Sequence, residues 1–211
     1  MTIGDRITAV VFDLGGVLID WSPEYLYEDL IPHSGERLSF LTTVCTPEWN
    51  HLMDAGRSVP EAVAALAEEH PQSADLIHAW WQRWPEMLGG DYPRTVAIAR
   101  ELFDKKLSIY ALTNWAAETW PYAMDRFPFL SALFEGIVVS GDEGLAKPDA
   151  AIFRLLADRY GLDPKRTAFI DDSEANIEVA TELGFHAHQY IGAEQLRNWL
   201  VEHQLIDGTA S

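Results

Sequence analysis

The chain has 211 residues, a length that suits one α/β domain or one domain with a modest insert. Lys and Arg total 15 against 33 Asp and Glu, so the formal net charge is −18. Such a field repels phosphate backbones and anionic lipid, so we expect neither a nucleic-acid partner nor a membrane. The single cysteine, Cys45, excludes a disulfide within the chain. We expect a cytoplasmic protein in which this thiol is buried and inert.

The order of the predicted elements indicates the fold class. Four apolar, β-branched-rich runs predict strands, at residues 7–12, 107–112, 136–140 and 167–170. Residues 185–190 predict a fifth strand. Helical patterns follow at 93–105, 116–126, 149–160, 174–183 and 193–203. Alternating strands and helices form βαβ units, and these give a parallel sheet. The predicted class is therefore α/β, a doubly wound, Rossmann-like sheet formed by residues 1–19 and 92–211.

Residues 20–91 break this alternation, because they show helical periodicity and no convincing strand. They contain three prolines at possible helix starts, Pro23, Pro47 and Pro60, and three nearby capping residues, Ser22, Thr46 and Ser58. The segment predicts an all-helical insert, or cap, after the first strand. It carries four of the eight tryptophans, Trp49, Trp80, Trp81 and Trp84. We expect most of them to fill the core of the cap; the alternative is that one or two line a pocket facing the first strand.

Polar residues of a particular kind follow four of the predicted strands. They are Asp13, the pair Thr113 and Asn114, Lys147, and the pair Asp171 and Asp172. Taken alone, each is explained as a turn former, a solvated lysine or a helix cap. Four such coincidences in chain order are much less expected. Because the carboxyl ends of parallel strands meet at one edge of a sheet, the sequence predicts that these side chains converge.

The chemistry of this set is that of phosphoryl transfer. A carboxylate can attack phosphorus and form an aspartyl-phosphate. Several acids at one sheet edge repel each other unless a divalent cation lies among them, and Mg²⁺ binds carboxylates, backbone carbonyls, waters and phosphate oxygens. A hydroxyl donor and a lysine supply further charge stabilisation. The residues therefore predict a Mg²⁺-dependent hydrolase of small phosphate monoesters.

The whole chain resembles the haloacid dehalogenase-like (HAD) hydrolase superfamily. Four motifs match in order: FDLGGVL, LTN, AKPDAAIF and IDDSEANIEVATELG. The resemblance implies that residues 20–91 are the helical cap which this family inserts after its first strand. It implies that Asp13 is the nucleophile and that the backbone carbonyl of Gly15 binds Mg²⁺. In the last motif, Asp172 would be the second carboxylate ligand, with Asp171 as a ligand or water-mediated support.

The same resemblance implies roles for the remaining residues. Thr113 and Asn114 would hold the phosphoryl oxygens of the substrate. Lys147 would neutralise the nucleophile and the phosphate. Asn176, at the start of the next helix, would orient the acid pair.

One position departs from the family pattern. The family's phosphatases usually carry a second aspartate two residues after the nucleophile, which protonates the leaving alcohol and then activates water. Gly15 stands there instead, so an acid–base contribution of about 10²–10⁴-fold in rate is missing. Some sugar-phosphate phosphatases of the superfamily look similar, which makes sugar phosphates one expected substrate class. An acid from the cap, Asp54 or His51, could substitute, and a positive φ at Gly15 would strain any residue placed there.

Two other functions stay open. A 2-haloacid dehalogenase, or another metal-independent aspartyl-ester hydrolase, also lacks the second aspartate; the acid pair disfavours it, because the pair would repel a carboxylate substrate. A catalytically silent binding protein is supported by Gly15 alone. A phosphonate hydrolase would need a cap lysine, and residues 20–91 contain none. His186 and His188 share one strand face, but with no third ligand nearby we expect packing or surface roles.

Overall fold

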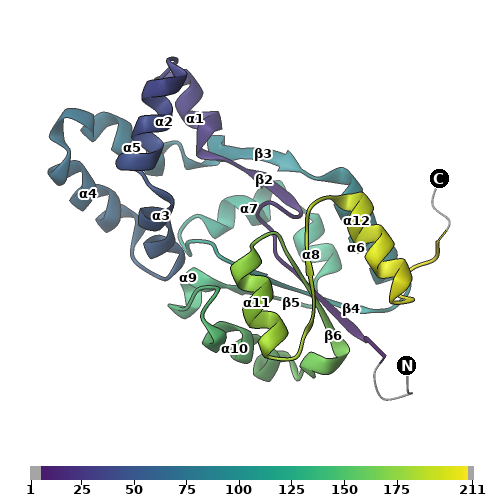
Figure 1. Cartoon of the computed structure of the whole chain (residues 1–211). Helices are drawn as coiled ribbons and strands as arrows, with labels where there is room; N and C mark the ends of the chain where they lie inside the picture. Colours follow the sequence, from purple (N-terminus) through teal and green to yellow (C-terminus); the bar gives the residue numbers. More distant parts are fainter. Residues whose placement is uncertain (1–5, 209–211) are drawn as a thin grey trace.

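The computed structural model describes residues 6–208, and its centre is a five-stranded parallel sheet (Figure 1). The spatial order is β5-β4-β1-β6-β7. The bounds are β1 Ala9–Phe12, β4 Ser108–Thr113, β5 Gly136–Val139, β6 Thr167–Asp171 and β7 His186–Gln189. The predicted strands are confirmed to within about two residues at each end, the usual uncertainty of strand limits.

Both faces of the sheet are covered, which confirms the doubly wound class. Neighbouring strand residues point to opposite faces. One core contains Val10 and Phe12 with residues of α6 (Pro93–Asp104), α8 (Phe129–Leu133) and α12 (Ala193–Glu202). The other contains Val11 and Phe169 with residues of α10 (Ala150–Tyr160) and α11 (Glu174–Glu182). Strand β1 is fully buried between these layers, which explains its unbroken apolar sequence.

Three details of the core differ from the sequence prediction. Helix α7 (Trp120–Arg126) begins four residues late, because the N–H groups of Thr119 and Trp120 bond to the carbonyl of Ala116 in a preceding turn. The short helices α8 and α9 (Ser140–Glu143) were not predicted. None of the helices within residues 6–208 has the length and apolar character needed to cross a membrane.

The segment after the first strand contains five α-helices, gathered apart from the sheet in Figure 1. They are α1 Pro23–Leu30, α2 Ser34–Thr43, α3 Pro47–Asp54, α4 Val59–Glu69 and α5 Ala74–Gln82. Ser22 and Thr46 cap α1 and α3, as predicted, by accepting hydrogen bonds from the N–H groups of Glu24 and Trp49. Ser58 stands at the start of α4 without a capping bond from its side chain.

The two ends of this segment pair as strands, so the expectation that it holds no strand is wrong. Strand β2 (Ile19–Trp21) runs antiparallel to β3 (Leu88–Asp91). β3 has the sequence LGGD, which carries no strand propensity. It becomes a strand because the chain leaves and re-enters the sheet domain at adjacent points, where the two backbones can pair. Figure 1 shows this ribbon connecting the helices α1–α5 to the rest of the molecule.

Candidate active site

Asp13 lies directly after β1, at the carboxyl edge of the sheet. Its backbone N–H donates to the carbonyl of Ile170 at 2.8 Å, which continues the ladder between β1 and β6. One carboxylate oxygen accepts from the N–H of Leu14 at 2.7 Å. The side chain is buried, and register places it beside the ends of β4 and β6. A fixed carboxylate at a shared strand edge is the geometry that a nucleophile requires.

Lys147 is an almost fully buried charge, with 1% of its surface exposed. Its Nζ lies 3.0 Å from Asp13 Oδ1 and 2.6 Å from Asp171 Oδ2, and it donates to the carbonyl of Leu112 at 2.8 Å. Burial by itself lowers the pKa of this ammonium, but the two carboxylates outweigh burial and raise it. Lys147 therefore stays charged, and the interpretation of it as a solvated surface residue is wrong.

The side-chain amide of Asn114 binds the backbone of Lys147. Its Nδ2 donates to the carbonyl of Lys147 and its Oδ1 accepts from the N–H of the same residue, both at 2.9 Å. The side-chain amide is thus occupied in fixing the backbone of the lysine. These two bonds position Lys147. That Asn114 also holds phosphoryl oxygens stays a prediction.

Thr113 is the last residue of β4, and its hydroxyl differs from the Asn114 amide in its hydrogen bonding. The residue is 1% exposed, and within the described residues Oγ1 has no hydrogen-bond partner. A buried hydroxyl without a partner is destabilising by about 1–3 kcal/mol unless something binds it. This hydroxyl is therefore a donor available to a substrate oxygen.

The acid pair at the end of β6 has a buried member, Asp171, and an exposed one, Asp172. Asp171 Oδ1 accepts from the N–H of Ser173 and from Asn176 Nδ2, each at 2.9 Å, while Oδ2 faces Lys147. Asp172 is exposed toward the site. A Cβ on Gly16, whose φ is +73°, would lie 2.4 Å from Asp172 Oδ2, so only glycine leaves room for this carboxylate. Asn176 orients Asp171 by its side chain, while Asp172 keeps its oxygens available.

The three carboxylates form a site suited to a hard divalent cation. Ligand atoms of Asp13, Asp171 and Asp172 lie within 4.8 Å of one another. Burial, with the charge of Asp171, raises the pKa of Asp13 to about 7, against the opposing effect of Lys147. Burial and Asp171 also raise the pKa of Asp172. One ammonium does not balance three acids, and an all-oxygen donor set is what Mg²⁺ prefers, so the residues present fit this metal.

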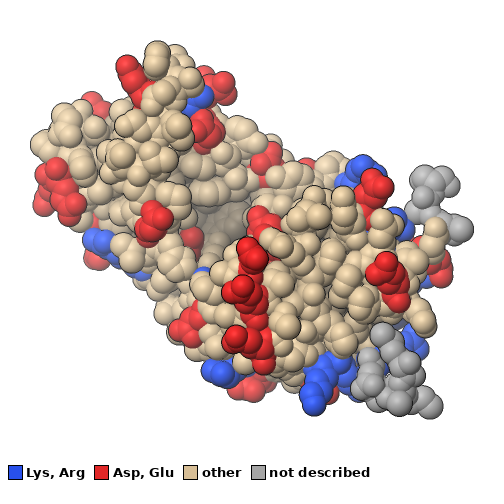
Figure 2. Space-filling model, viewed as in Figure 1, with Lys and Arg blue, Asp and Glu red and all other residues tan. Residues whose placement is uncertain are grey.

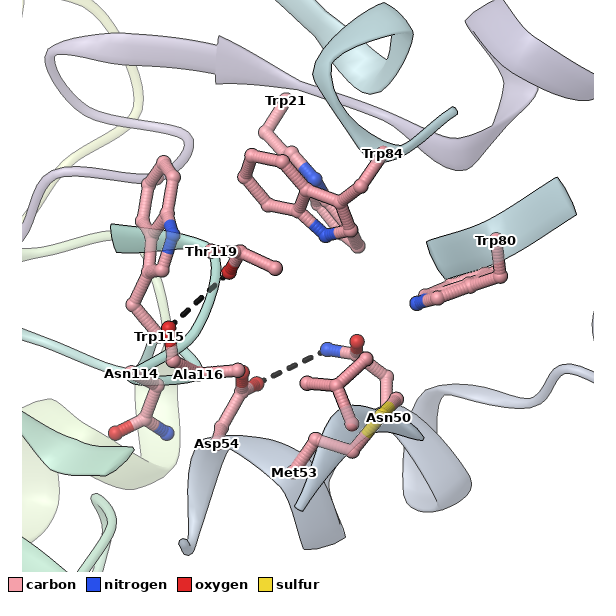
Figure 3. A pocket seen from close by; sticks show the side chains of 12 residues that line it. Trp21, Asn50, Met53, Asp54, Trp80, Trp84, Asn114, Trp115, Ala116 and Thr119 are labelled. Atoms are coloured by element: carbon pink, nitrogen blue, oxygen red, sulfur yellow. Dashed lines mark hydrogen bonds between the residues drawn. The ribbon is translucent and has the colours of Figure 1, made fainter. Parts of the chain in front are cut away.

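A pocket of about 80 Å³ opens between the sheet edge and the helices α3 and α5. It is lined by Gly15, Trp21, Asn50, Met53, Asp54, Val59, Trp80, Trp84, Asn114, Trp115, Ala116 and Thr119. Figure 3 shows the four indoles around one side of it, with Asp54 and Asn50 on the other. Figure 2 shows a recess in the same region, between the two parts of the molecule. The pocket opens near Asp13, since Gly15, two residues further along the chain, is one of its lining residues.

Both of the roles expected for the cap tryptophans occur, since some line the pocket and others fill the core of the cap. Trp80 and Trp84 line the pocket, whereas Trp49 packs edge-on against Trp80 in the core of the cap. Trp21 and Trp115 also line the pocket, and they come from outside the cap helices: Trp21 lies in β2, and Trp115 directly follows the LTN motif. Their indole nitrogens are buried and find no acceptor among residues 6–208. The sequence signal for these two pocket residues was the presence of a tryptophan close after each of the motifs FDLGGVL and LTN.

The other candidates from the sequence have structural roles. His186 contacts the carbonyl of Lys165 at 2.8 Å, and His188 stacks on Trp199. Burial raises the pKa of Cys45 to about 12, so this buried thiol is unreactive, as expected. His51 is exposed and outside the pocket lining, so of the two cap residues considered only Asp54 faces the site.

These motifs agree with comparisons to known proteins. A family model described as haloacid dehalogenase-like hydrolase matches residues 7–184. The chain therefore belongs to the haloacid dehalogenase-like hydrolases, as its motifs predicted, and it is an enzyme of that class. The sesquiterpene phosphatase astK of Aspergillus oryzae is 26% identical over 177 residues, which are 83% of this chain and 86% of that protein.

Solved structures show the same fold. A HAD family enzyme of Bacteroides thetaiotaomicron, in complex with magnesium and inorganic phosphate, is 26% identical with a TM-score of 0.65, covering 87% of this chain and 93% of that one. The L-2-haloacid dehalogenase of Xanthobacter autotrophicus is 20% identical with a TM-score of 0.64, covering 95% of this chain and 85% of that one. The second likeness concerns the fold alone.

Proposed function

We propose that the protein is a Mg²⁺-dependent phosphatase that hydrolyses small phosphate monoesters through an aspartyl-phosphate on Asp13. The observation that carries this proposal is the cluster of Asp13, Asp171 and Asp172 beside the ammonium of Lys147. Two comparisons support it, since one relative is named a phosphatase and one structure holds magnesium and phosphate. An enzyme for haloacids would not need three clustered acids, which repel a carboxylate substrate.

The reaction follows from the positions of the side chains. A carboxylate oxygen of Asp13 attacks phosphorus, and the bond from phosphorus to the alcohol oxygen breaks. The free hydroxyl of Thr113 donates to a phosphoryl oxygen, while Lys147 balances the charge. Water then hydrolyses the aspartyl-phosphate and regenerates Asp13.

The metal site completes this arrangement. Asp13, Asp172 and the carbonyl of Gly15 would hold Mg²⁺, with Asp171 in support through its contact with Lys147. When bound there, the ion would supply charge neutralisation for phosphoryl transfer.

The pocket favours an apolar alcohol as the leaving group. Four indoles, Met53 and Val59 dominate its wall, and only a few side chains there could serve a polyhydroxylated sugar. Sugar hydroxyls buried against indoles would be left unpaired, which is unfavourable. The name of the Aspergillus relative supports an apolar substrate. Within the expected monoesters, we therefore place apolar alcohols before sugars.

A phosphate-release screen tests the activity. The panel contains sugar phosphates, nucleotides, aryl phosphates and prenyl phosphates, each measured with Mg²⁺ and with EDTA. We expect release that EDTA abolishes and Mg²⁺ restores. Full activity in EDTA would contradict the metal site, and metal-independent chloride release from 2-chloropropionate would favour the dehalogenase. No reaction with any substrate would favour the silent binding protein.

A homologous series of alkyl phosphates tests the leaving-group pocket. Each methylene buried contributes about 0.8 kcal/mol, so kcat/KM should rise by up to roughly fourfold per methylene until the pocket is filled. Glucose phosphates serve as the polar comparison. A flat series, or a clear preference for the sugar phosphate, would contradict an apolar leaving group.

A further inference from the structure

Gly15 leaves an open space where relatives with the second aspartate carry a carboxyl. Apart from Gly15 and its two chain neighbours, no heavy atom of residues 6–208 lies within 4 Å of the position that its Cβ would take. The backbone here is ordinary, because the glycine with positive φ is Gly16 and not Gly15. The open space belongs to the pocket that is lined by the tryptophans. An acid from elsewhere in the chain can therefore reach the leaving group through this pocket.

Asp54 is the one ionisable side chain in the pocket lining. It is the last residue of α3, so the cap delivers it and the sheet does not. One carboxylate oxygen accepts from Asn50 Nδ2 at 3.0 Å, and the N–H of Ala116 approaches it from the loop after β4. Figure 3 shows Asp54 directed toward Ala116, across the base of the pocket from the indoles. It is thus held between cap and core, in the lining of the pocket that the proposed function assigns to the leaving alcohol.

We propose that Asp54 is the general acid and base of the hydrolysis, in place of the absent side chain at Gly15. This role presupposes the phosphatase activity proposed above. When the bond from phosphorus to the alcohol oxygen breaks, the carboxyl of Asp54 gives its proton to that oxygen, and the alcohol leaves neutral. In the second step, the carboxylate of Asp54 takes a proton from the water that attacks the aspartyl-phosphate. Inorganic phosphate leaves, Asp13 is restored, and Asp54 is protonated again.

The surroundings of Asp54 suit both halves of this cycle. Burial raises the pKa of its carboxyl to about 7, although the N–H of Ala116 and the charge of Lys147 act in the opposite direction. Asn50 on the same helix is neutral, and Lys147 is the charged group that acts on Asp54 from the core. Near neutral pH, a carboxyl in this state is present in both its acid and base forms.

The variant Asp54→Asn separates proton transfer from the other steps. On an alkyl phosphate, kcat should fall by about 10²–10⁴-fold, because the alkoxide leaves without a proton. On 4-nitrophenyl phosphate, whose leaving group needs no proton, the first step should persist. We expect a burst of about one nitrophenolate per enzyme, followed by slow turnover as unassisted water attacks the aspartyl-phosphate. In the wild type, kcat/KM on the alkyl phosphate should decline above about pH 7 as Asp54 ionises, and the variant should lack this decline.

A purely structural role predicts other results. Since burial disfavours the charged form of Asp54, the neutral Asn should not lower Tm at pH 8, whereas loss of a structural contact would lower it. Small carboxylic acids such as formate should restore part of the alkyl-phosphate activity in Asp54→Ala, which a structural defect would not permit. Glu48→Gln, on the exposed first turn of the same helix, is the matched control and should match wild type.

The outcomes distinguish this proposal from the phosphatase activity itself. Wild-type turnover of alkyl phosphates in Asp54→Asn would overturn the role of Asp54 and leave the phosphatase intact. An equal loss on both substrates without a burst, or a lowered Tm without formate rescue, would also overturn it. If the wild type releases no phosphate from any monoester, both proposals fail together.

Discussion

The two sides of the active site are built by different physical means. On the phosphate side, charged groups hold one another: Lys147 contacts two carboxylates and a carbonyl, and Asp171 uses both oxygens. On the leaving-group side, most of the wall is aromatic, and the indole nitrogens of Trp21 and Trp115 have no partner within residues 6–208. Under the proposed function, the first side is fixed for one chemistry, while the second is shaped by packing and would decide which alcohol is accepted.

The largest expected effect on activity is at Asp13, the proposed nucleophile. Asp13→Asn keeps the shape of the side chain but cannot attack phosphorus, so we expect at most a trace of activity on every substrate. The fold should survive, because Lys147 retains its contact with Asp171. Steady-state kinetics and circular dichroism check both points. More than about a tenth of wild-type kcat would mean that Asp13 is not the nucleophile, since a tenfold loss is only ~1.4 kcal/mol.

Lys147→Ala should affect activity and stability together. Removal of the ammonium leaves the carboxylates of Asp13 and Asp171 uncompensated in a buried site, an effect of about 3–5 kcal/mol on the free energy of unfolding. Phosphate affinity and kcat should both fall, and Mg²⁺ should recover part of the stability. Urea unfolding with and without Mg²⁺ measures this. The matched control is Lys165→Ala on the exposed surface, and kinetics like those of this control would contradict the role of Lys147.

The phosphate side could be predicted from the sequence because its residues follow the strand ends. Buried β-branched runs locate the strands, and a parallel sheet then brings their carboxyl ends together. The bonds from Asn114 to the backbone of Lys147 could not be predicted, since an amide can serve a substrate or a backbone equally well. The depth of Lys147 was also hidden, because a lysine is ordinarily exposed and its burial depends on two carboxylates distant in the chain.

The leaving-group side could not be assembled from the sequence. Trp21 belongs to a ribbon whose partner strand, LGGD, has no strand signature, and Trp115 reaches the pocket from the loop after β4. Asp54 faces the site only because α3 ends there. Such contacts between cap and core depend on tertiary packing, which local patterns do not encode.

The substitution Gly15→Asp tests whether an acid on the phosphate side can replace the one on the leaving-group side, because it would place a carboxyl next to Asp13. The site has room for a Cβ and no positive φ, so the expected risk of strain does not apply. On alkyl phosphates, the substitution should raise the turnover of Asp54→Asn by about tenfold or more, a part of the usual acid–base contribution. Gly16→Asp is the matched control and should be inactive, since its Cβ would clash with Asp172 at positive φ.

A well-folded Gly15→Asp enzyme that binds Mg²⁺ but gains no activity on alkyl phosphates would count against the hypothesis that the absent carboxyl at position 15 limits the rate. Equal rates of aryl and alkyl phosphates in the wild type, with chemistry rate-limiting, would count against it more heavily. Circular dichroism must accompany the kinetics, because a folding defect would imitate the first of these results.

The smallest expected effect concerns the unpaired indole of Trp115. Trp115→Phe keeps an aromatic ring in the pocket but removes a buried N–H donor that has no acceptor in residues 6–208. If a substrate oxygen accepts from this donor, its KM should rise by about 2–12-fold, corresponding to a net hydrogen bond of about 0.5–1.5 kcal/mol. A plain hydrocarbon phosphate should lose nothing, or bind slightly better. Trp199→Phe, on α12 outside the pocket, controls for the loss of an indole elsewhere. Paired alkyl and ether-containing phosphates, compared by KM, reveal the difference. An equal change for both would show that Trp115 acts by shape alone, and the two sides of the site would then differ even more sharply, one working through charge and the other through packing.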